Sequence, residues 1–341
     1  MYQFQCDYSE GAHPRILQRL METNLEQTVG YGMDKYCFEA QMAIGRAIGR
    51  HDVDIHFLVG GTQANMTVIS SILRPHQGVI CATTGHINVH ETGAIEHSGH
   101  KVIAIEAENG LLPASKVREV MEAHLAEDGP EHTVQPGMVY ISLSSELGTV
   151  YSPRQLAELY MVCKKYGLYL FLDGARIGYG LAAGDPTLKL GEISCYCDVF
   201  TIGGTKQGAL FGEAVVIAND ALKKDFRYHI KQNGGMLAKG RLLGIQFLTL
   251  FEDGLYFELS RHAVEQALRI KEAFKAKGYE FLIDSPSNQQ FPILDNETMQ
   301  RLAMDFRFSV WQKIDDTHTA VRFCTSWATK PEAVDALIAA L

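Results

Sequence analysis

The clearest pattern in the chain is a strand, a helix and a second strand between residues 138 and 172. Met138–Ser142 and Leu168–Leu172 are short apolar runs, and the second is continuous enough to be buried on both faces. Between them, Arg154–Tyr166 carries apolar residues at helical spacing. Ser152 and Pro153 precede it as an N-cap and a first-turn proline. Two strands joined in this way predict a right-handed crossover in a parallel sheet.

Other apolar runs fit the same plan. Further strands are predicted at Ile55–Val59, Val79–Ala82, Lys101–Ile105, Asp198–Ile202 and Ala214–Ala218, with a helix from about Thr62 to Leu73. After about Gly244 the pattern changes to a long amphipathic helix, Ser260–Lys277, followed by shorter elements. These are strands near Phe281 and at Val321–Cys324, and helices at Asn296–Asp305 and Pro331–Leu341.

The predicted class is therefore α/β, with a mostly parallel sheet and a smaller C-terminal α+β domain. We expect three parts. Residues 1–30 form an N-terminal arm that contributes to the smaller domain, residues 31–244 form the large domain, and residues 245–341 form the small one.

Charge and cysteine usage narrow the function classes. The formal net charge is −9, and nucleic acids or anionic membranes would require clustered basic residues. No apolar run approaches membrane-spanning length, and the N-terminus lacks the pattern of a signal peptide. The seven scattered cysteines fit reduced thiols. We expect a cytoplasmic protein that acts on a small molecule, with no nucleic-acid or membrane partner.

The first candidate loop is Gly60–Asn65 (GGTQAN), which follows a predicted strand and opens a predicted helix. Open α/β sheets bind ligands at this edge. The glycines let backbone N–H groups approach an anion, and Thr62 adds a hydroxyl. Glycines at such a turn can equally serve geometry alone, so the loop is a phosphate site only in combination with others.

Two further loops supply an acid and a lysine. Asp173 ends the buried strand and precedes Gly174, Ala175 and Arg176, while Lys206 follows the next predicted strand. A strand-end ion pair and a solvated lysine are the ordinary interpretations. Combined with an anion site, however, the two groups meet the needs of pyridoxal phosphate. That cofactor requires a lysine for a covalent link and a carboxylate that keeps its ring nitrogen protonated.

A histidine-rich stretch, Gly85–His100, offers a different chemistry. His86 and His90 have the i, i+4 spacing of metal ligands on a helix. Glu91 is not placed as in a metalloprotease helix, and stacking of His86 on a cofactor ring needs only one histidine. We expect no metal.

Together these residues resemble the threonine aldolase and β-eliminating lyase group of fold-type I pyridoxal-phosphate enzymes. The resemblance covers most of residues 31–240 and extends weakly into the smaller domain. It rests on the segments YGMD (31–34), GGTQAN (60–65), GHINVHETGA (85–94), FLDGAR (171–176), TKQGALFG (205–212) and VRF (321–323). It implies the large and small domains of a fold-type I transferase, and a homodimer or homotetramer with shared active sites.

The resemblance also implies a role for each matching residue. Lys206 would carry pyridoxal 5'-phosphate, Asp173 would pair with its ring nitrogen, and His86 would stack on the ring. These three are the expected catalytic residues. The phosphate would be held by Gly60, Gly61, Thr62 and Asn65.

The substrate carboxylate, or the phenolic oxygen of the cofactor, would be bound by Arg176 and Arg322. Ser9 would lie near the same carboxylate. Tyr31 would reach the site of a neighbouring subunit, because active sites in this group lie at a dimer interface.

The chain departs from the group at several positions. The loop after Met138–Ser142 has no histidine, and Ser145 or Glu146 stands near that place. His90 replaces an aromatic residue. These changes leave the recognition of the substrate side chain open.

A further departure affects the phosphate. The arginine expected after GGM is replaced by Leu237, which leaves Lys239 or Arg241 as phosphate contacts.

The predicted reaction is cleavage of a β-hydroxy-α-amino acid, of the threonine or allo-threonine type, to glycine and an aldehyde. His86, Glu146 or an ordered water is the candidate base. The alternative within the same cofactor class is β-elimination from a small amino acid. A non-catalytic nucleotide-binding protein is disfavoured because neither dinucleotide nor P-loop spacing occurs.

Overall fold

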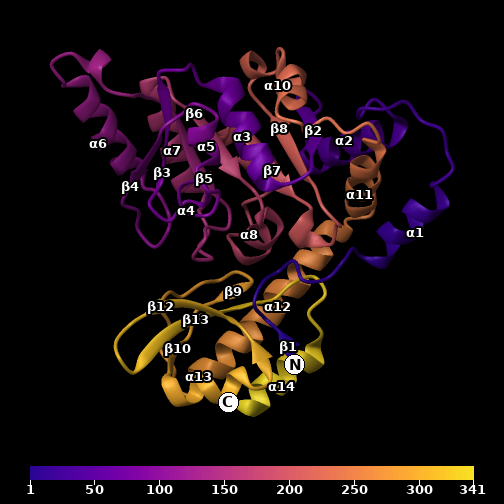
Figure 1. Ribbon diagram of the computed structural model, residues 1–341, viewed down its shortest axis with the longest axis vertical. Helices are drawn as coiled ribbons and strands as arrows, with labels where there is room; N and C mark the ends of the chain where they lie inside the picture. Colours follow the sequence, from indigo (N-terminus) through magenta and orange to yellow (C-terminus); the bar gives the residue numbers. More distant parts are fainter.

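The computed structural model describes all of residues 1–341, and its largest element is a seven-stranded sheet (Figure 1). The strands lie in the order β2-β8-β7-β6-β5-β3-β4. Their bounds are Asp54–Leu58 (β2), Gln77–Ala82 (β3), Val102–Ile105 (β4), Gln135–Ser142 (β5), Tyr169–Asp173 (β6), Val199–Gly203 (β7) and Glu213–Ile217 (β8). Only β8 is antiparallel to its neighbours. The predicted α/β class with a mostly parallel sheet is confirmed.

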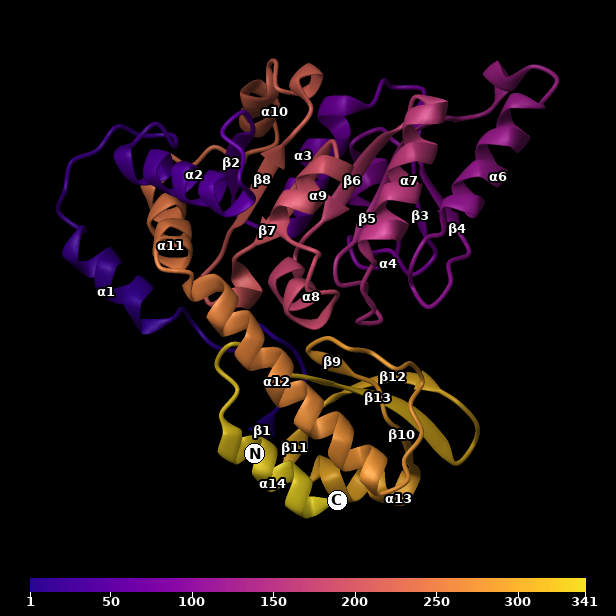
Figure 2. The same ribbon diagram turned by 180° about the vertical axis from the view of Figure 1, so that it is seen from behind.

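Helices cover both faces of this sheet because successive strand residues point to opposite faces. In β5, Val139 and Ile141 join one hydrophobic core, while Met138 and Tyr140 join the other. The first core is covered by α2 (Lys35–Ile48), α6 (Ala114–Leu125), α7 (Pro153–Tyr166), α9 (Leu190–Tyr196) and α11 (Arg241–Phe251). The second is covered by α3 (Gly61–Ile72), α4 (His86–Val89), α5 (Ala94–His97) and α10 (Phe226–Gln232). The helices over the first core face the viewer in Figure 2, and those over the second core face the viewer in Figure 1.

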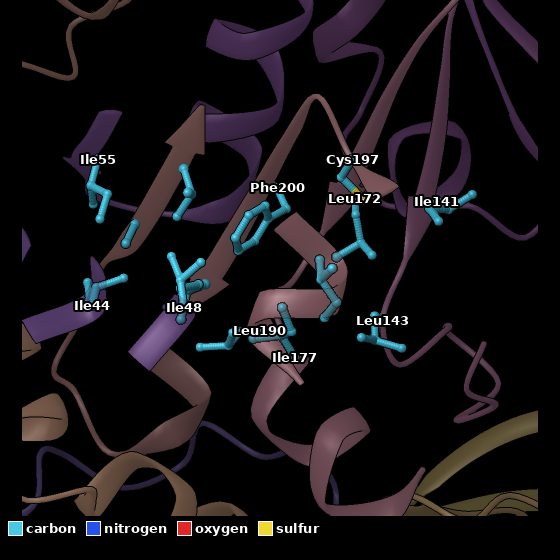
Figure 3. Close-up of a cluster of buried hydrophobic side chains, with 14 of the residues drawn as sticks. Ile44, Ile48, Ile55, Ile141, Leu143, Leu172, Ile177, Leu190, Cys197 and Phe200 are labelled. Carbon is cyan, nitrogen blue, oxygen red and sulfur yellow. The ribbon is translucent and has the colours of Figure 1, made fainter. Parts of the chain in front are cut away.

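Figure 3 shows how tightly the first layer is joined to the sheet. Ile48 of α2 and Leu190 of α9 lie with Phe200 of β7 and Leu172 of β6 in one buried cluster. Such packing fixes the strands in place, and with them the loops at their ends.

The crossover from β5 through α7 to β6 forms as predicted. Ser152 and Gln155 make a capping box, Pro153 occupies the first turn, and Gly167 ends the helix in the left-handed region at φ 69°. The strands pair in parallel so that Ser142 lies opposite Asp173. Both residues therefore reach the carboxyl edge of the sheet.

The reversal at β8 results from a short connection. β7 ends at Gly203, and the chain returns as β8 after a turn that contains the 3₁₀ helix Thr205–Gln207. The N–H of Gly204 donates to the carbonyl of Gly212 (2.9 Å) and closes this turn. So short a connection cannot make the crossover that a parallel strand requires.

A second unit holds a smaller antiparallel sheet and lies below the large sheet in Figure 1. Its strands are β9 (Gln289–Gln290), β10 (Ile293–Asp295), β12 (Ser309–Lys313) and β13 (His318–Cys324). The helices are α12 (Leu255–Ala276), α13 (Asn296–Ala303) and α14 (Pro331–Ala340). The N-terminal arm joins this unit, because β1 (Tyr2–Gln3) pairs with β11 (Phe306–Arg307) and Phe4 is buried beside Phe323.

Two local predictions change, and the expected domain boundary falls within a helix. The long helix begins at Leu255 rather than Ser260, directly after Gly254 in the left-handed region. The strand expected near Phe281 is a single bridge to Pro292, which has no N–H to extend a ladder. The domain boundary expected after residue 244 falls inside α11, so the division of the chain stays a prediction.

The remaining helices are α1 (Pro14–Glu22) and α8 (Ile177–Ala183). None of the helices combines the length and the apolar character needed to cross a bilayer.

Candidate active site

The three loops singled out in the sequence meet around one cavity of about 300 Å³. It lies where the carboxyl ends of β2, β5, β6 and β7 adjoin the amino end of β8. We call it the inner cavity. Its lining includes Gly60–Thr62, Asp173 and Lys206. Glu146 and Glu213 line it as well. The sequence indicated Glu146 as a candidate base but did not indicate Glu213.

The loop after β2 forms an open cradle for an anion. Helix α3 starts at Gly61 and has no capping side chain, so its first-turn N–H groups are free of side-chain acceptors. A Cβ built at Gly60 or Gly61 would meet no atom within 4 Å, because both glycines face open space. Thr62 lines the same cavity. The geometry suits a phosphate, as predicted for these three residues.

Asp173 is held as a carboxylate by a ring of donors. The Tyr140 hydroxyl (2.6 Å) and the Asn65 amide (2.9 Å) donate to Oδ2, and the Ala175 N–H donates to Oδ1 (2.9 Å). Burial alone would raise the pKa of Asp173, but His86 and these donors outweigh burial and lower it. A charged acid at the end of β6 can therefore hold a proton on a ring nitrogen.

Asn65 serves these carboxylates and not the phosphate loop. It is buried one turn into α3, and its amide also donates to Glu91 Oε1 (2.7 Å). The expected phosphate contact is thereby corrected, because the Asn65 amide nitrogen already donates to two buried carboxylates.

His86 lines the inner cavity beside Asp173 and is oriented by Glu91. Its Nδ1 lies 2.7 Å from Glu91 Oε1, and the Glu91 side chain is fully buried. Burial lowers the pKa of His86, but Glu91 and Asp173 more than compensate and raise it. Glu91 lies within the segment GHINVHETGA (85–94), but the sequence alone did not indicate that it orients His86.

Lys206 lies between positive and negative neighbours. Burial is the main cause that lowers the pKa of its amine, and Arg176 lowers it further. The acids Asp7, Glu213 and Asp173 act in the opposite direction without restoring the usual pKa. A lysine of lowered pKa provides the neutral amine that covalent attachment of a carbonyl cofactor requires.

Glu146 links the start of α4 to the end of β5 beside the inner cavity. Its Oε1 accepts from the His86 N–H (3.0 Å) and from the Ser142 hydroxyl (2.8 Å). Burial raises its pKa, and Asp173 raises it further. Glu146 occupies the loop where the resembling enzymes carry a histidine.

A second cavity of about 560 Å³ opens from the first and is called the outer cavity below. The two share Tyr8, His86, Glu146, Arg176 and Lys206. The outer cavity adds residues from the small unit, namely Gln289, Ser309, Val310, Trp311 and Arg322, together with His90.

Arg322 lines the outer cavity. Its guanidinium lies over the Trp311 ring, 5.1 Å from the centroid, and donates to Gln289 Oε1 (3.2 Å). Its buried Nε has no partner. A substrate carboxylate in the outer cavity would compete with Gln289 and the Gln5 carbonyl for the terminal nitrogens of Arg322.

Arg176 lines both cavities and is paired with an acid of the N-terminal arm. Its Nε and one terminal nitrogen donate to the two oxygens of Asp7, at 2.7 and 3.0 Å. Asp7 is fully buried on the N-terminal arm and also accepts from Asn288 (2.9 Å). Two guanidinium nitrogens are thus committed to Asp7, and the expected contact of Arg176 with the substrate carboxylate or the phenolic oxygen of the cofactor stays a prediction.

Ser9 and Tyr31 lie outside both cavities. Ser9 is exposed and contacts Cys6, while its neighbour Tyr8 lines both cavities. Tyr31 is exposed beside Lys231 and Arg227, so its role in another subunit stays a prediction.

The histidine-rich stretch does not converge on a point. His86 pairs with Glu91, and the buried His100 contacts the Gln77 carbonyl (3.1 Å). No group of three or more histidine, cysteine or acidic side chains is arranged to hold a metal ion.

The two residues proposed to replace the missing phosphate arginine also lie elsewhere. Arg241 donates to the carbonyls of Glu26 and Asn24, and Lys239 is exposed outside both cavities.

A larger cavity, about 1160 Å³, lies between α6 and α7. It shares no lining residue with the inner or the outer cavity, so its size does not make it the candidate site.

Comparisons with known proteins agree with this geometry. Residues 3–295 match the family described as β-eliminating lyase. A low-specificity L-threonine aldolase from a Pseudomonas species is 30% identical, over 99% of this chain and 96% of the relative. A solved structure of Leishmania major threonine aldolase is 42% identical, with a TM-score of 0.96 over 99% of this chain and 98% of the other.

The fold alone is shared more widely. A Thermus thermophilus aspartate aminotransferase is 14% identical, with a TM-score of 0.72 over 100% of this chain and 90% of the other. The family match and the similarity over nearly the full length show that this chain belongs to the β-eliminating lyase family, with threonine aldolases among its relatives.

Proposed function

We propose that this enzyme binds pyridoxal phosphate in the inner cavity and cleaves a β-hydroxy-α-amino acid to glycine and an aldehyde. By homology the chain is a lyase of the threonine aldolase type. The observation that carries the proposal is the convergence of a buried carboxylate, a lysine of lowered pKa and a glycine cradle on one cavity.

The residues present fit the cofactor. The open space at Gly60 and Gly61 suits its phosphate, Lys206 suits the covalent link, and Asp173 suits the ring nitrogen. When bound, pyridoxal phosphate accepts the electron pair of the bond that breaks at the α-carbon. His86, oriented by Glu91, would lie against the ring.

The chain's own residues then orient the substrate. Arg322 would bind the carboxylate from the outer cavity, where its Nε lacks a partner. Arg176, held by Asp7, keeps only part of its guanidinium for the substrate or the phenolic oxygen.

Glu146 is the base that this geometry favours for the β-hydroxyl proton. It lines both cavities, and a carboxylate of raised pKa is a better proton acceptor than an ordinary one. His86 is the weaker candidate, because Glu91 and Asp173 favour its protonated form.

The test is product analysis with L-threonine and L-allo-threonine. Acetaldehyde and glycine in equal amounts support the proposal. Glu146→Gln is expected to lower kcat by about 10²- to 10⁴-fold and to remove the acidic limb of its pH profile. A variant that keeps that limb assigns the base elsewhere.

β-Elimination remains the second candidate because a buried Glu146 carboxyl could also protonate a group leaving Cβ. Release of ammonia and pyruvate from serine or cysteine, without acetaldehyde from threonine, would favour it.

We also propose that the enzyme works as a dimer or tetramer. Large apolar side chains are exposed along α1, the following loop and α2, which form one flank in Figure 1. These are Leu17, Met21, Leu25, Val29, Tyr31, Met33, Phe38 and Met42. In a dimer, a second copy would cover these side chains, and Tyr31 of each copy would reach the inner cavity of the other. Sedimentation as a monomer at micromolar concentration would contradict this proposal. A cytoplasmic location stays a prediction.

A further inference from the structure

A second buried acid of the inner cavity has no role in the reaction described so far. Glu213 is the first residue of β8 and is only 4% exposed. Its Oε2 is buried without any hydrogen-bond partner, although the residue lines the cavity. An unpaired buried carboxyl oxygen is unfavourable unless it serves another group.

The reversal of β8 places this acid beside the lysine turn. Glu213 lies opposite Gly203 of β7 and opposite Leu58 of β2. Lys206 follows Gly203 by three residues, in a turn closed by the Gly204–Gly212 hydrogen bond (2.9 Å). The N–H of Gly212 also donates to the Thr205 hydroxyl (3.2 Å). Both side chains therefore enter the same small cavity from one rigid hairpin.

The groups around this pair are few. The Tyr256 hydroxyl donates to the Gly203 carbonyl (2.9 Å), so it does not satisfy Glu213. The charged neighbours of Lys206 are Arg176, Asp7 and Asp173. Asp7 and Asp173 both have close donors of their own. Glu213 is the acid in this set whose carboxyl oxygen is left without a partner.

We propose that Glu213 is the proton partner of the Lys206 amine within the inner cavity, which both side chains line. The exchange conserves charge. The carboxyl O–H bond breaks as an N–H bond forms at Nζ, so a neutral acid and amine become a carboxylate and an ammonium. Such a pair lets the lysine change its proton count while the net charge of the cavity stays the same. This inference rests on the proposed function, because it assumes that Lys206 carries the cofactor.

Electrostatics agree with the geometry. Burial raises the pKa of Glu213 to about 8, although Lys206 opposes the shift. At neutral pH the carboxyl therefore holds a proton that it can give, and above pH 8 its negative charge stabilises a protonated nitrogen at Lys206.

The test is a pH titration of the visible absorbance of the protein loaded with pyridoxal phosphate. Glu213→Gln keeps the size of the side chain but cannot ionise. Because the opposite charge is lost, the midpoint of the absorbance change is expected to fall by about one pH unit or more. Tyr256→Phe, which alters a neighbouring hydroxyl without changing charge, should leave the midpoint in place.

Two further measurements keep the outcomes distinct. Glu213→Leu, a second uncharged variant, should show the same fall as Glu213→Gln. Acetylation of Lys206 in cofactor-free protein, followed by mass spectrometry, should begin at lower pH in both. An unchanged midpoint in Glu213→Gln overturns the role of Glu213. A wild-type protein that shows no visible band at all overturns the proposed function itself.

Discussion

The inner and outer cavities share five residues, yet they are built from different parts of the chain. The inner cavity is formed by the ends of strands in the large sheet, and its Asp173 carboxylate accepts three hydrogen bonds. The outer cavity takes half of its lining from the small unit, on β9, β12 and β13. Under the proposed function, the residues that would hold the cofactor are thus fixed by one rigid sheet. Substrate selection would then depend on how the small unit and the N-terminal arm meet that sheet.

The sharpest way to break this comparison is to remove the covalent anchor of the inner cavity. Lys206→Ala should lower turnover to below about one thousandth of the wild-type value, because the attachment amine is lost. The visible absorbance band of the bound cofactor should shift as well. Lys224→Ala, at an exposed position outside both cavities, is the matched control. Full turnover in Lys206→Ala would remove Lys206 from the site.

Asp173→Asn tests the inner cavity without removing the anchor. The amide cannot hold a proton on the ring nitrogen, so kcat should fall by about 10²- to 10³-fold while the cofactor stays bound. Tyr140→Phe removes one of the three donors to Asp173 and should cause a smaller loss. Steady-state kinetics with cofactor content measured in parallel would decide, and an unchanged kcat in Asp173→Asn would contradict its assigned role.

For the outer cavity the expected effect is on binding. Arg322→Lys keeps the charge but loses the fork that grips a carboxylate with two parallel hydrogen bonds. KM should rise by about 10- to 100-fold with little change in kcat. Arg307→Lys, exposed on β11 of the same unit, should alter neither. A loss confined to kcat would place Arg322 in the chemistry of the inner cavity instead.

The two cavities also differ in how far sequence reasoning could reach them. The inner loops were predictable because each follows an apolar strand in a regular crossover pattern, so Asp173 and Lys206 had to emerge at one edge. The residues that surround Asp173 and Lys206 could not be predicted in this way. Tyr140 reads as one more apolar strand residue, and the role of Glu213 depends on the antiparallel return of β8, which no periodicity reveals.

The outer cavity was harder still. Its residues come from both ends of the chain, and Asp7 pairs with a side chain 169 positions away. Pairings at that separation follow from the tertiary fold, not from local pattern. The sequence predicts that the arm joins the small unit, but it indicates Ser9 as the residue near the substrate. In the structure Tyr8 lines the outer cavity and Asp7 pairs with Arg176.

The last prediction concerns this arm. Burial would raise the pKa of Asp7, but Arg176, Lys206 and Asn288 outweigh it and lower the pKa to about 2. An acid whose folded pKa is depressed stabilises the fold above its unfolded pKa, near 4, and loses that contribution as pH falls toward 2. The wild-type protein should therefore lose about 2 kcal/mol of unfolding free energy through Asp7 across this window.

Denaturant unfolding at pH 4.5, 3.5 and 2.5 measures that loss. Asp7→Asn should be less stable than the wild type at pH 4.5, since it leaves the Arg176 charge unpaired. Its stability should then fall less steeply with acid. Asp52→Asn is the control, because the Asp52–Arg50 pair lies at the surface where solvent screens it. If Asp7→Asn and the wild type lose stability in parallel, the arm is held by its β1–β11 pairing and by the burial of Phe4, and the junction between the two units does not depend on the Asp7–Arg176 pair.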